Sequence, residues 1–204
     1  MNVTDLKSIH NKVRELGFVI FDKNPCDMNV IGLRRLPGTP NAFDDLMTLS
    51  YLEDGQWKFH AWPCTTDPGG KYLGKPMNPG IGTAVLKHDD QFRGSHKMGI
   101  HGASKSWAHP ALVQVGVLRV WHDNNRDNVV DYGLAQTTSN GTSGINLHRD
   151  LGDFSAGCQV FKNRKDQEEF IALCRKQITA KLGDTYTYTL LSWASDKMPA
   201  AGVQ

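Results

Sequence analysis

Several features that mark common protein classes are missing from this chain of 204 residues. No run of eighteen apolar residues occurs, so no membrane-spanning helix is expected. The first residues hold no apolar segment typical of a signal peptide, which predicts a protein that is cytoplasmic when made. Lys and Arg number 23 against 21 Asp and Glu, without a long basic run. This balance lacks the charge pattern of nucleic-acid-binding proteins, so we expect neither nucleic acid nor a membrane as a partner.

Clustered cysteines and recognisable metal-ligand motifs are also missing. The four cysteines stand at positions 26, 64, 158 and 174 without a Cys-x-x-Cys pair, which argues against a zinc ribbon or a disulfide scaffold. The eight histidines include no His-Glu-x-x-His motif. His96, His101 and His109 have no recognisable ligand spacing either. We therefore expect no metal in the active site.

The chain contains 20 glycines and 9 prolines between short apolar runs, which predicts a mainly β protein with a few helices, of the α+β class. Apolar spacing predicts a helix that is capped by Thr4 and ends at Gly17, and a second helix over about 164–181 with Asn163 as its cap. Asp54-Gly55 predicts a hairpin turn. Strands are expected over 83–86, 111–121 with its clearest part at 117–121, and 185–191, and an exposed polar loop over 136–144.

The stretch over 63–81 is rich in glycine and proline, which suggests a loop that separates an N-terminal part from the rest of the chain. We expect residues 1–77 to form an N-terminal helix and hairpin segment packed on a catalytic domain of residues 78–204. The two parts are expected to make one compact unit. The tail after residue 191 is rich in small residues and is expected to fray.

Two neighbouring segments hold the residue types of a catalytic site. They are Gly144-Ile-Asn-Leu-His148-Arg149 and Ser155-Ala-Gly-Cys158-Gln159. A free thiol is mostly protonated at neutral pH, and a nearby imidazole helps to generate the thiolate. We therefore predict Cys158 as a nucleophile and His148 as its base. The glycine at position 157 allows a close backbone approach, and the amides around Gly157 and Cys158 could stabilise an oxyanion. An acyl-enzyme thioester is the implied intermediate.

These residues resemble the catalytic motif of the L,D-transpeptidase family, β-rich cysteine enzymes that remodel bacterial peptidoglycan. His148 matches the upstream histidine of that family, Ser155 its Ser or Thr, and Gly157-Cys158 its Gly-Cys pair. The resemblance covers about residues 80–191 and looks most like a divergent branch among phage and bacterial proteins. It implies a β-sandwich core, peptidoglycan stem peptides as substrate, and His148 as the base.

The chain departs from the family pattern at three points. Ala156 stands where the family has a second histidine, the stretch from His148 to Cys158 is short, and Gln159 replaces an apolar residue. We expect Ser155 and Gln159 to contact the substrate. Arg149 has two interpretations: it binds a stem-peptide carboxylate, or it forms an ion pair with Asp150 or Asp153.

His101 is the rival to His148. The stretch Gly99-Ile-His101-Gly102 looks locally more like the family's Ile-His-Gly, although it lies 57 positions before Cys158. We favour His148 as the base, since it leads into the segment that presents the cysteine, and expect His101 in the substrate cleft or in a structural role. The competing interpretation of the whole motif is a tight turn beside an unrelated surface histidine.

Oxygen-bearing side chains at Asp123, Asn125, Asp127 and Asp131 follow the beginning of a calcium-loop pattern. The loop lacks the glycine at its sixth position and the glutamate at its twelfth. A polar turn is the favoured interpretation, and calcium is the alternative.

The sequence thus predicts a metal-independent cysteine enzyme of L,D-transpeptidase, carboxypeptidase or endopeptidase type that acts on peptidoglycan stem peptides. One alternative is a phage virion or tail protein in which a degenerate catalytic fold serves structure or cell-wall binding, with other virion proteins as partners. A further alternative is a cysteine amidase or peptidase with another substrate. A virion-associated protein, or one released to the cell wall, would fit the phage-like resemblance. Whether water or an amine accepts the acyl group stays open.

Overall fold

A computed structural model describes residues 1–133, 143–152 and 155–194. Within these residues the chain forms three helices and ten strands. In chain order they are α1 (Leu6–Glu15), β1 (Asn29–Leu36), β2 (Asp45–Glu53), β3 (Gln56–Thr65), α2 (Gly70–Gly74), β4 (Thr83–Leu86), β5 (Asp90–His101), β6 (His109–Gln114), β7 (Val120–Asp123), β8 (Leu147–Arg149), β9 (Gln159–Phe161), α3 (Arg164–Thr179) and β10 (Thr185–Ala194). The expectation of a mainly β protein with a few helices is confirmed.

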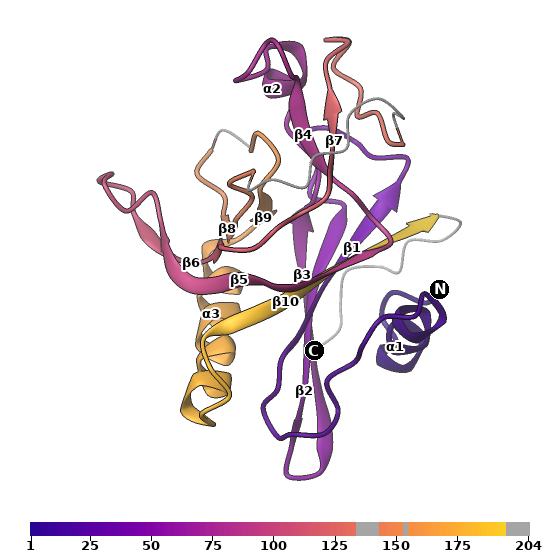
Figure 1. The fold of residues 1–204 in the computed structure, drawn as a ribbon, viewed down its shortest axis with the longest axis vertical. Coiled ribbons are helices and arrows are strands. Elements are labelled where there is room, and N and C mark those ends of the chain that lie inside the picture. The colour runs from indigo at the N-terminus through magenta and orange to yellow at the C-terminus, as the bar shows by residue number, and fades with distance from the viewer. Residues whose placement is uncertain (134–142, 153–154, 195–204) are drawn as a thin grey trace.

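Eight of the strands form a closed barrel in the order β1-β10-β5-β6-β8-β9-β3-β2, whereas β4 and β7 form a separate two-stranded sheet (Figure 1). The expected β-sandwich is therefore replaced by a barrel. Two of the barrel pairings are parallel, β1 with β10 and β8 with β9, while the other pairings in the barrel are antiparallel. Parallel pairs join segments that are distant in sequence, so local patterns do not reveal them.

Helix α1 begins one residue later than expected. The carboxylate of Asp5 accepts a hydrogen bond from the backbone N–H of Ser8 at 2.8 Å and therefore caps the helix, whereas the hydroxyl of Thr4 donates to the side chain of Asn2. A carboxylate at this position also interacts favourably with the helix dipole. Ile9 and Val13 are buried against the outside of the barrel.

The hairpin between β2 and β3 confirms the prediction from Asp54-Gly55. Both residues have positive φ, 51° and 73°, as a two-residue turn of type I′ requires. The strands pair over nine positions, from Asp45 with Cys64 to Glu53 with Gln56.

The strand expected over 117–121 forms only in its last part. Val120 and Trp121 belong to β7, but Val117 is exposed and the side chain of Arg119 turns to the carboxylate of Asp90. The backbone N–H groups of residues 115 and 116 both bond to the carbonyl of Ser95, which closes a turn just before this segment. Turn formation therefore overrides the alternating pattern. The twelve-residue strand β5, which is largely polar, was not anticipated.

Three apolar clusters hold the fold together. The largest fills the barrel and includes one face of α3, where Phe170 packs on Phe161 with 4.9 Å between ring centroids. A second lies between α1 and the outside of β1 and β10, and a third lies beneath the small sheet around Leu73 and Trp121. Figure 1 shows α1 and α3 on different sides of the barrel and the small sheet with α2 at its upper end. The expected α3 forms over 164–179, and buried Cys174 lies on its inner face.

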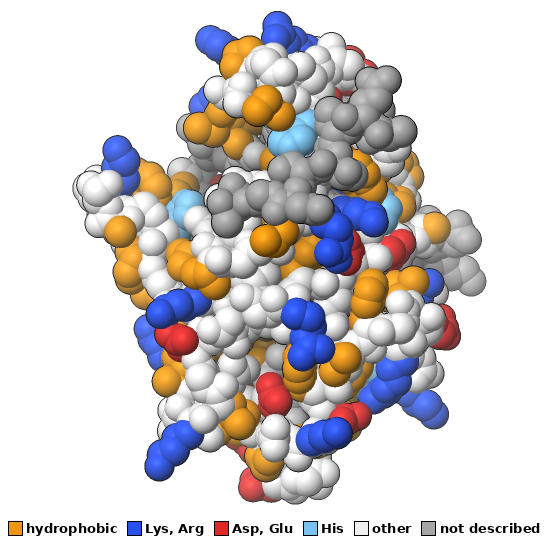
Figure 2. Space-filling view, viewed as in Figure 1, with side chains coloured by type: hydrophobic (Ala, Val, Ile, Leu, Met, Phe, Trp, Pro, Cys, Tyr) orange, Lys and Arg blue, Asp and Glu red, His pale blue; other side chains and the backbone are white. Residues whose placement is uncertain are grey.

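Residues 1–77 contribute three barrel strands, β1, β2 and β3, in addition to α1. The expected boundary at 77 falls between α2 and β4. The proposed polar loop over 136–144 and the tail lie mostly outside the described residues. On the face drawn in Figure 2, the described charged side chains of both signs are interspersed.

Candidate active site

Parallel pairing of β8 with β9 brings the predicted base and nucleophile together. His148 pairs with Val160, and Cys158 lies two residues before Val160 along the chain. The backbone N–H of Asn146 donates to the sulfur of Cys158 at 3.3 Å, which extends the register beyond the strand ends. Because side chains alternate along a strand, Asn146, His148, Cys158 and Val160 face the same side.

A cavity of about 510 Å³ lies over this side, and both Cys158 and His148 line it. Its walls also include Tyr72, Met77, His101, Trp107, Ser155 and Ala156. The cavity thus combines a thiol and two imidazoles with apolar walls. Such a composition suits the binding of an organic substrate beside a nucleophile.

A backbone hydrogen bond determines the tautomer of His148. Its Nδ1 lies 2.7 Å from the carbonyl oxygen of Arg149. A carbonyl can only accept, so Nδ1 carries the proton and Nε2 keeps a free lone pair. His148 is therefore poised to accept a proton at Nε2.

His101 has the opposite tautomer. The backbone N–H of Gln114 donates to Oδ1 of Asn146 at 2.9 Å, and this bond orients the Asn146 amide. Its Nδ2 must then donate to Nδ1 of His101, 2.9 Å away, which leaves the proton of His101 on Nε2. These hydrogen bonds therefore make Nε2 of His148 a proton acceptor and Nε2 of His101 a proton donor.

The two imidazoles are stacked, with 3.9 Å between ring centroids and 8° between their planes. Burial, followed by the neighbouring His101, lowers the pKa of His148 to about 3. Burial also lowers the pKa of His101, with His109 as the second cause. Each imidazole is thus neutral at pH 7, which is the state that the two tautomers require.

The thiol of Cys158 is neutral as well. Burial raises its pKa to about 11, against a smaller opposing effect of the hydrogen bond from Asn146. The sequence predicted that the histidine generates a thiolate, whereas in the structure the thiol and the imidazole that line this cavity are both neutral, and the thiol donates to the carbonyl oxygen of Gly144 at 3.5 Å. In such a pair the proton leaves sulfur during the attack rather than before it.

We predict that alkylation of Cys158 by iodoacetamide rises about tenfold per pH unit from pH 7 to 10, because only the thiolate reacts. A raised pKa moves the appearance of thiolate to higher pH, so the rate should still increase where an ordinary thiol near pKa 8.5 has levelled off. Peptide mapping by mass spectrometry separates the four cysteines, and urea-unfolded protein is the reference. A Cys158 rate that plateaus near pH 6 would show a preformed thiolate and contradict the neutral pair.

The turn before Cys158 is held by Ser155. Its hydroxyl donates to the carbonyl oxygen of Cys158 at 2.6 Å and accepts from the N–H of Gly157 at 3.2 Å. Gly157 has φ of 128°, and a Cβ there would lie 2.5 Å from the carbonyl oxygen of Ala84. Only glycine fits this position. Ser155 also lines the cavity, and its contact with a substrate stays a prediction.

Gln159 is placed differently from the expectation. It is fully buried and points to the opposite side from the cavity residues. Its Oε1 accepts from the hydroxyl of Tyr188 at 2.9 Å, and its Nε2 donates to the carbonyl of Gly157 at 3.1 Å. A substrate in the cavity cannot reach this amide, so the expected substrate contact of Gln159 is wrong.

Arg149 forms no ion pair with Asp150 within the described residues, and Asp153 lies outside them. The contact that the structure gives it is through its backbone, since its carbonyl orients His148. The positive charge of Arg149 contributes to lowering the pKa of His148. Its binding to a substrate carboxylate stays a prediction.

Sequence reasoning missed three residues at the site. Asn146 orients His101 through a hydrogen bond. The ring centroid of Trp107 lies 5.4 Å from that of His101. His109 lies edge-on to both stacked imidazoles. Asn146 could have been found, because it stands two residues before His148 and so faces the same side of a strand. Trp107 and His109 reach the site through the β5–β6 hairpin, whose pairing was not anticipated.

The acidic segment after β7 forms a turn held by its own hydrogen bonds. The amide of Asn125 donates to Asp127 at 3.0 Å and to Asp131 at 2.6 Å, and Asp123 accepts from the N–H of Asp131 at 3.0 Å. Across the described residues no three or more His, Cys, Asp and Glu side chains are grouped as metal ligands. The geometry favours the polar turn, and calcium binding stays a prediction.

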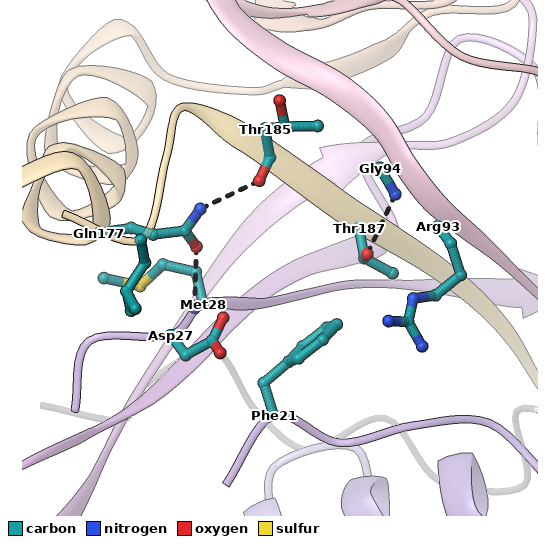
Figure 3. A pocket seen from close by; sticks show the side chains of 9 residues that line it. Phe21, Asp27, Met28, Arg93, Gly94, Gln177, Thr185 and Thr187 are labelled. Carbon is teal, nitrogen blue, oxygen red and sulfur yellow. Dashed lines mark hydrogen bonds between the residues drawn. The ribbon is translucent and has the colours of Figure 1, made fainter. Parts of the chain in front are cut away.

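A second cavity of about 450 Å³ lies beside Arg93 and Gly94 of β5 and the first residues of β10 (Figure 3). Asp27 and Arg93 lie on either side of Phe21, whose ring centre is 5.1 Å from the Arg93 guanidinium. No cysteine or histidine lines this cavity. A third cavity, of about 390 Å³, is lined by Cys26 but by no histidine, so among these three cavities a thiol and imidazoles occur together only in the one over Cys158.

In the part of the chain that the structure describes, no helix has the length and apolar character needed to cross a membrane. A comparison of the chain with protein-family models, curated proteins and solved structures finds no match. The residues of the site itself therefore carry the functional argument.

Proposed function

We propose that the protein is a cysteine acyltransferase that acts on peptide bonds of peptidoglycan stem peptides through a thioester on Cys158. The observation that carries this proposal is the neutral Cys158 thiol in one cavity with His148, whose Nε2 lone pair is free to accept a proton. The resemblance of the 148–158 segment to L,D-transpeptidases suggests the substrate.

Acylation begins with attack of the Cys158 sulfur on the substrate carbonyl carbon while His148 Nε2 takes the thiol proton. A carbon–sulfur bond forms, and the carbonyl electron pair moves to oxygen. As this tetrahedral intermediate collapses, the carbon–nitrogen bond breaks and the leaving amine takes the proton from His148. The products are a thioester and a free amine.

Release of the acyl group repeats these steps with a new nucleophile. His148 removes a proton from water or from an acceptor amine, which attacks the thioester, and the sulfur leaves as a thiolate that regains the proton. Water gives hydrolysis, and an amine gives a crosslink. The apolar residues Met77 and Trp107 line the cavity in which the acceptor would enter.

One observation favours the alternative of a non-catalytic wall-binding or virion protein. Ala156, which stands where the resembled family has a histidine, lines the cavity with a methyl group beside a thiol that is not ionised. In that case the cavity would bind stem peptides without forming an adduct.

Intact-mass analysis after incubation with a tetrapeptide stem or a carbapenem tests the proposal. We expect a covalent adduct whose mass fits the acyl group and which maps to Cys158. The Cys158→Ala variant should form none, whereas Cys26→Ala, at a half-buried cysteine outside the cavity, should behave like the wild type. Peptide turnover by Cys158→Ala, or binding without any adduct on the wild type, would overturn the proposal.

A further inference from the structure

The Gly157–Cys158 peptide unit is anchored from inside the barrel. Gln159 is fully buried, and its Nε2 donates to the carbonyl oxygen of Gly157 at 3.1 Å and to that of Thr66 at 3.4 Å. The hydroxyl of Tyr188 donates to its Oε1 at 2.9 Å, so the amide oxygen is engaged as well. Every polar atom of this side chain is therefore engaged.

The Thr66 carbonyl that accepts from Gln159 also accepts from a buried charged group. The guanidinium of Arg34 donates to the same Thr66 carbonyl at 2.5 Å and lies 3.0 Å from the carboxylate of Asp67. Arg34 is fully buried, and Asp67 is nearly so. Breaking such a buried pair is strongly destabilising, so Thr66 presents its carbonyl to Gln159 from a stiff support.

The direction of the Gly157 carbonyl determines the direction of the next N–H. In a trans peptide the C=O and N–H point in opposite directions. Since the Gly157 carbonyl points inward to Gln159, the N–H of Cys158 points away from Gln159, and the side chain of the same residue lines the cavity. The described residues provide no acceptor for this N–H.

We propose that Gln159 is the positioning residue that holds the N–H of Cys158 ready to donate to the substrate oxyanion. The inference rests on the proposed acyl transfer and adds the group that stabilises its tetrahedral intermediate. The positive φ of Gly157 allows the peptide unit between Gly157 and Cys158 to adopt this orientation. The hydrogen bond from Gln159 to the Gly157 carbonyl prevents that peptide unit from rotating.

A Gln159→Met variant keeps the side-chain length and removes the donor to Gly157. We expect kcat to fall by about tenfold to a hundredfold, because a misplaced oxyanion donor costs that order of rate, with KM within about twofold. Alkylation of Cys158 by iodoacetamide should stay within about twofold, since displacement at a saturated carbon develops no carbonyl oxyanion. Tyr188→Phe removes a hydrogen bond to Gln159 but leaves both amide donors, and should change kcat less than threefold.

Two results would overturn the inference: an unchanged kcat in Gln159→Met, or equal losses in kcat and in alkylation, which would show that the sulfur itself has moved. If Gln159→Met does not fold, Gln159→Asn, which is one methylene shorter, allows the same comparison.

Reversible capture of a peptide aldehyde separates this inference from the proposed function, since the adduct carries the same oxygen and needs no turnover. Weaker capture by the variant than by the wild type supports the role of Gln159 even if stem peptides prove not to be substrates. Equal capture by both proteins overturns it.

Discussion

A His148→Gln variant is expected to lose about a hundredfold to ten-thousandfold in kcat, while His101→Gln loses less than about tenfold. The reason is the pair of opposite tautomers. The Nε2 of His148 accepts protons because its Nδ1 donates to the Arg149 carbonyl, whereas the Nε2 of His101 carries a proton because its Nδ1 accepts from Asn146. Steady-state rates on a stem peptide, with the folding of both variants checked by circular dichroism, measure the difference.

The pH profile gives a second measurement of the same assignment. A base whose pKa is lowered to about 3 remains deprotonated throughout the neutral range. For a lowered pKa, the loss of the active form occurs only as pH falls toward that value, so kcat/KM should show no inflection near pH 6.5. A larger loss in His101→Gln than in His148→Gln would reverse the roles of the two histidines.

The second large effect is expected from Gly157→Ala, which should reduce kcat by about a hundredfold or more. The added methyl group would lie 2.5 Å from the backbone oxygen of Ala84 in β4, where no side chain can move aside. Its φ of 128° also lies in a region that strains other residues by about 1–3 kcal/mol. The Cys158 turn must therefore shift, and with it the nucleophile.

Gly144→Ala is the matched control. Gly144 also has positive φ, 71°, and its carbonyl accepts from the Cys158 thiol, but no atom of the described residues lies within 4 Å of an added Cβ. Gly144→Ala should thus strain the backbone without a steric clash like the one between residue 157 and Ala84. Thermal unfolding together with kcat separates the two effects, and equal losses of kcat in both variants would mean that strain alone explains the result.

Local signals predicted those parts of the fold that depend on local physics. Asp54-Gly55 indicated a tight turn because both residues tolerate positive φ, and the apolar spacing around Phe170 indicated α3 because one face must be buried. The sequence also indicated that Cys158 and His148 lie in one site, and both line the same cavity. A parallel pair of three-residue strands, β8 and β9, produces this arrangement.

Other features depend on partners that are distant in the chain. Strand β5 is polar because part of it is exposed, so it carries no apolar signal, and the 117–119 segment has such a signal but turns aside to reach Asp90. The role of Gln159 was misjudged for a related reason. Its position next to Cys158 suggested contact with substrate, but alternation along β9 directs it into the barrel toward Tyr188.

Closure of the barrel makes the first third of the chain indispensable to the rest. β10 pairs with β1 along one side and β9 pairs with β3 along another, so a fragment that starts at residue 78 would expose two unpaired strand edges. Open edges of this kind recruit other chains and promote aggregation. A shorter chain that keeps the Cys158 cavity in a closed sheet would therefore need a different pair of strands to replace the β1–β10 and β3–β9 pairings.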